Sequence, residues 1–144
     1  MCIAAALYGE GAKAVFDLTS GDIQKIEKHL IKGLSATAEY YRDHNRSFKA
    51  IVVISGNAYK FFISDLKHSP YADMQEVSEK QSYLRTQFRN LQDSYYVKFK
   101  MCSKGMKSRK IPEAVVYRFV EMDKIKNVYL IDAQNQGYAY LPIH

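Results

Sequence analysis

The stretch that decides the fold is Phe48-Lys49-Ala50-Ile51-Val52-Val53-Ile54-Ser55, followed by Gly56-Asn57. It is rich in β-branched residues and almost wholly apolar, which is typical of a central strand in a parallel sheet, buried on both faces. Gly56 and Asn57 favour tight turns, and they end the run abruptly. This segment therefore predicts a buried strand whose carboxyl end opens into a turn.

The segments on either side alternate between strand and helix patterns. Apolar runs predict further strands at residues 14–18, 95–102, 115–120 and 138–143. Apolar residues at helical spacing predict helices at 22–41, 71–91 and 123–136, with short helices at 58–62 and 106–111. This alternation predicts one α/β domain: a mostly parallel sheet of about five strands with helices on both faces.

Cys102 stands at one of the positions where such a sheet binds ligands. Parallel sheets bind ligands at the carboxyl ends of their strands, where the loops 19–21, 55–57 and 102–104 are expected to gather. A basic stretch, residues 103–110, follows Cys102, and nearby cations stabilise a thiolate. Such a thiolate can carry sulfur, react with an oxidant or bind a metal. The alternative is a small buried core residue, which the spacing alone favours.

Composition narrows the classes of function. The chain has 144 residues, enough for one domain with a proper core, and its formal net charge of +6 favours anionic partners. Nucleic acid is not favoured, because the common recognition motifs are missing. No run is long enough for a transmembrane segment. His and Cys residues lack metal-ligand spacing and no nucleotide-binding glycine motif occurs, so no metal and no cofactor are predicted.

Residues 1–12 are unusual. Met1-Cys2-Ile3-Ala4-Ala5-Ala6-Leu7-Tyr8 is small and apolar, and polar, flexible Gly9-Glu10-Gly11-Ala12 follows. This pattern is typical of the back half of a secretory signal peptide, and the alternative is an ordinary first strand or helical turn. We therefore expect residues 1–12 to be a signal-peptide remnant or a flexible N-terminus and 13–144 to be the domain. A periplasmic or secreted location is favoured, with a cytoplasmic one as the alternative.

Beyond these general patterns, the carboxyl-terminal part of the chain resembles a known family. The elements that carry the resemblance are Lys100-Met101-Cys102-Ser103-Lys104-Gly105-Met106, then Ile111-Pro112, Val120 and Gln134-Asn135-Gln136-Gly137-Tyr138-Ala139-Tyr140-Leu141. Together with the earlier strands, this pattern is similar to the DsrE/DsrF-like (YchN-like) family of sulfur oxidation and relay proteins, over roughly residues 13 to 143. Where that family often has Asn and then Thr after the cysteine, this chain has Lys104 and Gly105.

The resemblance implies a single α/β domain that forms oligomers, commonly trimers or dimers of trimers. In sulfur-trafficking members the cysteine that matches Cys102 accepts sulfur as a persulfide and passes it to a partner. A homotrimer or hexamer is therefore expected here, and the twelve tyrosines suit subunit interfaces.

The leading hypothesis is a sulfur-handling protein in which Cys102 accepts sulfur. We expect the ammonium groups of Lys104 and Lys107 to lower the pKa of Cys102 and to hold an anionic donor, with help from backbone N–H groups. The ligand-binding residues would be Gly56, Asn57, Ser103, Lys104, Gly105 and Lys107. One alternative is a binding protein without covalent chemistry, which holds a small anion such as an acidic sugar or a sulfur oxyanion. A purely structural oligomer is a third interpretation.

Overall fold

The computed structural model describes residues 11–144. Nearly all of the proposed signal-peptide remnant, residues 1–10 of 1–12, lies outside this range, so the export signal stays a prediction. Ala12, at the end of that segment, already belongs to the first strand. Across residues 11–144, no helix combines the length and apolar character that crossing a membrane requires.

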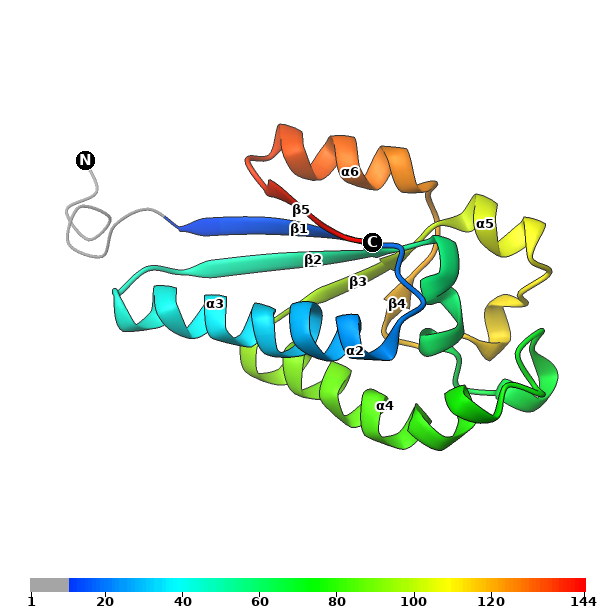
Figure 1. The fold of residues 1–144 in the computed structure, drawn as a ribbon. Coiled ribbons are helices and arrows are strands. Elements are labelled where there is room, and N and C mark those ends of the chain that lie inside the picture. Colours follow the sequence, from blue (N-terminus) through cyan, green and yellow to red (C-terminus); the bar gives the residue numbers. More distant parts are fainter. Residues whose placement is uncertain (1–10) are drawn as a thin grey trace.

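Five parallel strands form the sheet (Figure 1). They are β1 (Ala12–Leu18), β2 (Phe48–Ile54), β3 (Lys98–Met101), β4 (Val120–Glu121) and β5 (Ala139–Ile143). The strand order is β4-β3-β2-β1-β5, and every neighbouring pair runs parallel. The predicted α/β class with a five-stranded parallel sheet is confirmed. Among the strands of residues 11–144, β5 lies at the edge and pairs only with β1, and it contains Pro142 opposite Asp17.

Helices cover both faces of the sheet, as predicted (Figure 1). One helical segment joins β1 to β2 and consists of α2 (Ile23–Lys25), a wider π-helical turn (Ile26–Lys32) and α3 (Gly33–Asp43). It covers one face together with α4 (Gln75–Tyr95), and α6 (Lys126–Asn135) covers the other. The connections also contain α5 (Ser103–Ser108) and three 3₁₀ segments, Gly56–Phe62, Leu66–His68 and Glu113–Val115.

The predicted strand at residues 115–120 is largely wrong. Only Val120 and Glu121 pair with β3, whereas Val115 ends a 3₁₀ turn and Val116 forms an isolated antiparallel bridge with Ile63. The run is apolar because it is a buried loop segment, and burial makes it resemble a strand. The predicted strand at 95–102 also starts too early, since α4 continues to Tyr95 and the left-handed Tyr96 ends it.

The core has two parts, one on each face of the sheet. Alternate residues of β1 point to opposite faces, so that Phe16 packs under α2–α4 and Val15 packs under α6. Burial on both sides explains why β1 and β2 are almost continuously apolar. On the larger side, the ring of Phe88 stacks on Phe62 with centroids 4.5 Å apart, and Phe99 lies 5.6 Å from both. These rings attach α4 to the sheet.

We expect Phe88→Ala to lower the free energy of unfolding by about 3–5 kcal/mol, because it leaves a cavity in this cluster. Phe88 is 0% exposed, whereas Tyr83 on the same helix is 42% exposed. Tyr83→Ala therefore serves as the control, with an expected loss below about 0.5 kcal/mol. Urea denaturation measures both values, and equal losses would contradict this account of the core.

Candidate functional site at Cys102

Cys102 connects the carboxyl end of β3 to the start of α5. Its backbone N–H donates to the Ile54 carbonyl at the end of β2, at 3.0 Å. The N–H of the next residue, Ser103, donates to the Lys124 carbonyl, also at 3.0 Å, in the loop that leads to α6. Cys102 is thus held at the carboxyl edge of the sheet between two connections. It is largely buried, with 8% of its surface exposed.

Backbone N–H groups surround the sulfur atom. The N–H of Lys126, at the start of α6, donates to the Cys102 Sγ at 3.2 Å. Burial acts to raise the pKa of the thiol, but hydrogen bonds from the backbone N–H groups of Gly105, Lys126 and Lys104 outweigh it, so that the pKa is lowered. The thiol therefore loses its proton more readily than an ordinary cysteine does, and the thiolate is the nucleophilic form.

Tyr59 supports this arrangement from below α5. It comes from the 3₁₀ segment after β2, is fully buried, and donates its hydroxyl to the Cys102 carbonyl at 2.7 Å. A Cβ atom on Gly105 would overlap that hydroxyl and lie 2.7 Å from the ring carbon that bears it. Only glycine at position 105 therefore lets the ring reach Cys102. Burial raises the pKa of Tyr59, which keeps its hydroxyl protonated and able to donate.

Lys126 is fixed to the sheet through a buried carboxylate. Its Nζ lies 3.1 Å from Oδ1 of Asp17 on β1, and Asp17 is only 2% exposed. The hydroxyl of Tyr140 on β5 donates to the other carboxylate oxygen, and this hydrogen bond raises the pKa of Tyr140 to about 12. The ion pair holds the first residue of α6 in place, and so keeps its N–H directed at Cys102.

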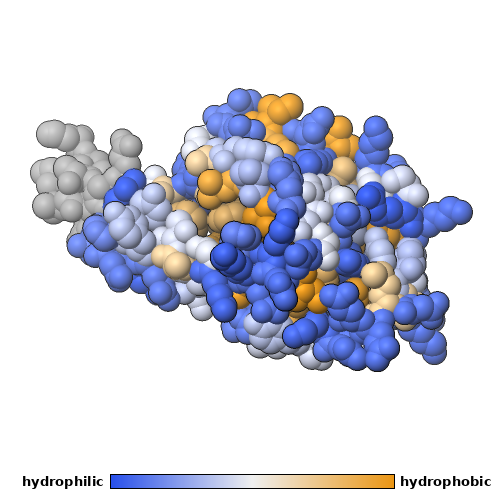
Figure 2. Space-filling view, in the orientation of Figure 1, coloured by the Kyte–Doolittle hydropathy of each residue, from blue (hydrophilic) through white to orange (hydrophobic). Residues whose placement is uncertain are grey.

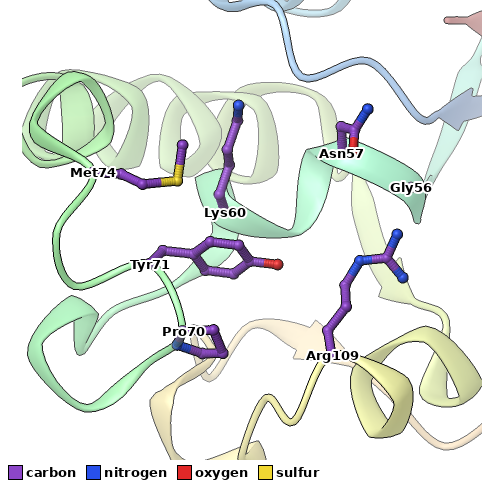
Figure 3. Close-up of a pocket in the computed structure, with 7 residues that line it drawn as sticks. All are labelled: Gly56, Asn57, Lys60, Pro70, Tyr71, Met74 and Arg109. Carbon is purple, nitrogen blue, oxygen red and sulfur yellow. The ribbon is translucent and has the colours of Figure 1, made fainter.

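Gly56 and Asn57 lie in a separate pocket of about 320 Å³ (Figure 3). Gly56 has a φ of +60°, and a Cβ there would come 3.1 Å from the Thr19 carbonyl, so the turn needs glycine. The pocket is lined by Gly56, Asn57, Lys60, Pro70, Tyr71, Met74 and Arg109. Neither Cys102 nor the predicted lysines Lys104 and Lys107 are among these residues.

The structure thus divides the predicted site in two. Lys104 and Gly105 stay with Cys102, but through their backbone N–H groups, and the side chains of Lys104 and Lys107 are exposed on α5. The N–H of Ser103 bonds to Lys124 instead of the sulfur. Within residues 11–144, His, Cys, Asp and Glu side chains form no group of three or more that could hold a metal ion.

Sequence reasoning missed three residues of this region. Tyr59 and Lys126 are 43 and 24 residues from Cys102 along the chain, and no local pattern connects them to it. Arg109 lies inside the basic stretch that drew attention to Cys102, so the signal was present there. Its guanidinium stacks over the ring of Tyr59, 4.9 Å from the centroid, which places it between the two parts of the site.

The source of the thiol's acidity can be tested with two substitutions in a Cys2→Ser background. Tyr59→Phe removes the hydroxyl that bonds to the Cys102 carbonyl and so holds the N–H groups of α5 around the sulfur. The pKa of Cys102 should therefore rise, and stability should fall by about 1 kcal/mol. Lys104→Gln keeps the backbone N–H, and the pKa should stay unchanged. The pH dependence of alkylation measures both. A rise with Lys104→Gln as large as with Tyr59→Phe would show that the ammonium group sets the pKa.

Comparison with known proteins agrees with this architecture. Residues 13–143 match the DsrE/DsrF-like family. An uncharacterized protein of Aquifex aeolicus (strain VF5) is 32% identical over 136 residues, which make up 94% of this chain. The chain spans only 58% of that relative's length. The solved structure of MTH1491, a protein of unknown function from Methanobacterium thermoautotrophicum, superposes with a TM-score of 0.70 at 16% identity, covering 91% of this chain and 98% of that one. This chain belongs to the DsrE/DsrF-like family.

Proposed function

We propose that this protein is a sulfur carrier in which Cys102 accepts sulfur as a persulfide and passes it to a partner. The main support is the group of N–H donors around Sγ, which lowers the pKa of the thiol. Membership of a family associated with sulfur relay points in the same direction. The same donors would stabilise the Cys102 thiolate when it leaves as the outer sulfur passes to an acceptor.

The proposed transfer needs only a donor that carries sulfane sulfur. The Cys102 thiolate attacks the terminal sulfur of a donor persulfide, R–S–SH, and a new S–S bond forms at Sγ. The donor's own S–S bond breaks, and R–S⁻ leaves with the bonding electron pair and takes up a proton. An acceptor thiolate removes the outer sulfur by the same exchange, which restores Cys102. Because little of Cys102 is exposed, the donor must present its sulfur at the end of a flexible or slender group.

The test is mass spectrometry of the intact protein after incubation with a glutathione persulfide donor and no other reductant. We expect an added mass of about 32 Da, one sulfur atom, on a peptide that contains Cys102, and its loss after a thiol acceptor is added. Cys2→Ser should keep the added mass and Cys102→Ser should lose it. Failure of the Cys2→Ser protein to gain mass would contradict the proposal, as would equal labelling of the Cys102→Ser protein.

We also propose that copies of this chain associate, as the family resemblance suggests. Support comes from exposed apolar side chains on α6, where Val128 and Ile131 lie one turn apart and Ile131 is 56% exposed. Figure 2 shows apolar residues gathered along the edge of the molecule that α6 occupies. Tyr140 and Leu141 on the neighbouring strand β5 are exposed as well. Burying these side chains against a second copy would stabilise an oligomer.

Light scattering should give a multiple of the monomer mass for the wild-type chain, and Ile131→Asp should reduce it. A charge placed in an apolar interface loses hydration without gaining a partner, which weakens association. Tyr83→Asp, an exposed aromatic position on α4 at the opposite face of the sheet, is the matched control and should leave the mass unchanged. A wild-type protein that is monomeric at micromolar concentration would refute the association.

A further inference from the structure

Two cations line the pocket beside the thiol site without carboxylate partners. Neither Lys60 nor Arg109 forms an ion pair with any carboxylate of residues 11–144. The residues that line the pocket include no Asp or Glu. Two positive charges therefore face one concave space with nothing in the described chain to neutralise them. Such a space attracts anions, and its walls screen the charges less than open water does.

Arg109 is fixed in a position that suits an oxyanion. Its guanidinium lies over the ring of Tyr59, so part of its freedom is already lost before a ligand binds. In Figure 3 the Tyr71 hydroxyl points across the pocket toward Arg109, and the Nε end of the guanidinium is the part nearest to it. Burial raises the pKa of Tyr71, although Arg109 opposes this, so the hydroxyl stays a donor. The planar fork of an arginine binds two oxygen atoms of a phosphate or sulfonate group at once.

Apart from Asn57, the rest of the pocket lining is apolar. Pro70 and Met74 lie on the side away from Arg109, and the side chain of Tyr71 extends from that side toward Arg109 (Figure 3). Apolar walls are favourable surfaces for hydrocarbon and unfavourable ones for a bare inorganic ion. The volume of about 320 Å³ is at the small end of the range for small-molecule pockets.

We infer that this pocket binds a small organic anion with a phosphate or sulfonate group on a short apolar body. Arg109 and Tyr71 bind the oxyanion, Lys60 adds positive charge, and Pro70 and Met74 contact the apolar part. The inference goes beyond the proposed sulfur transfer and does not depend on it. Cys102 does not line the pocket, and Tyr59 contacts Cys102 through its hydroxyl and Arg109 through the face of its ring.

Isothermal titration calorimetry with propyl phosphate, propanesulfonate, inorganic phosphate and 1-propanol tests the inference. At least one of the two organic anions should bind, more tightly than inorganic phosphate, and 1-propanol should not. Which organic anion binds better identifies the headgroup. Binding of neither organic anion at millimolar concentration would overturn the inference, and so would inorganic phosphate binding as tightly as the better organic anion.

Substitutions of the lining residues test whether the ligand binds in this pocket. Arg109→Gln should weaken the affinity about tenfold or more, since a tenfold change corresponds to about 1.4 kcal/mol and the loss of one charged hydrogen-bonding group is at least that large. Lys60→Gln should weaken it too, and it leaves the contact between Arg109 and Tyr59 intact. The matched control is Lys107→Gln, an exposed lysine on α5 outside the lining, which should bind like the wild type. Affinities unchanged in both Arg109→Gln and Lys60→Gln would overturn the inference.

The thiol variant separates this inference from the proposed sulfur transfer. Cys102→Ser should retain the wild-type affinity for the anion, although it cannot carry sulfur. A protein that gains sulfur but binds no organic anion would reject the pocket alone. One that binds the anion but gains no sulfur would reject only the carrier role. Loss of anion binding in Cys102→Ser would contradict the independence of the two sites.

Discussion

The contact between the ring of Tyr59 and α5 is the constraint on which the rest of the site depends. The ring fits beneath this short helix only because residue 105 is glycine, and its hydroxyl then bonds to the Cys102 carbonyl. That contact fixes the first turn of α5, so that its N–H groups stay directed at the sulfur. The same ring positions Arg109 at the neighbouring pocket. One buried side chain therefore sets the geometry of both the thiol and the cationic pocket.

The sequence correctly predicted the strands that are both buried and hydrogen-bonded to a neighbour on each side. β1 and β2 lie in the middle of the sheet and are buried on both faces, so their apolar runs have no other explanation. Residues 115–117 are equally buried but lie in a loop, and burial alone cannot distinguish these two environments. The start of β3 was missed for a different reason: Tyr96 adopts a left-handed conformation that tyrosine rarely takes.

Topology made the location of the site predictable, but not the contacts within it. Because parallel strands end at a common edge, Cys102 and Gly56 could be assigned to the same region without knowledge of side-chain contacts. How the thiol is stabilised depends on which groups are directed at it, and the sequence cannot show that a backbone N–H of Lys126 is one of them. Lysine side chains near in sequence were expected to act, but those of Lys104 and Lys107 extend into solvent. Proximity along the chain was a poor guide to proximity at the sulfur atom.

The proline in the edge strand has a consequence for how copies of this protein can meet. β5 offers an open edge, and an open edge normally invites another strand to continue the sheet, the first step toward fibrous aggregation. Pro142 lacks the N–H that such a strand would need, and β5 has only five residues. Growth of the sheet from one molecule into the next is therefore discouraged. The proposed association would instead use contacts between side-chain surfaces, which can form closed assemblies of fixed size.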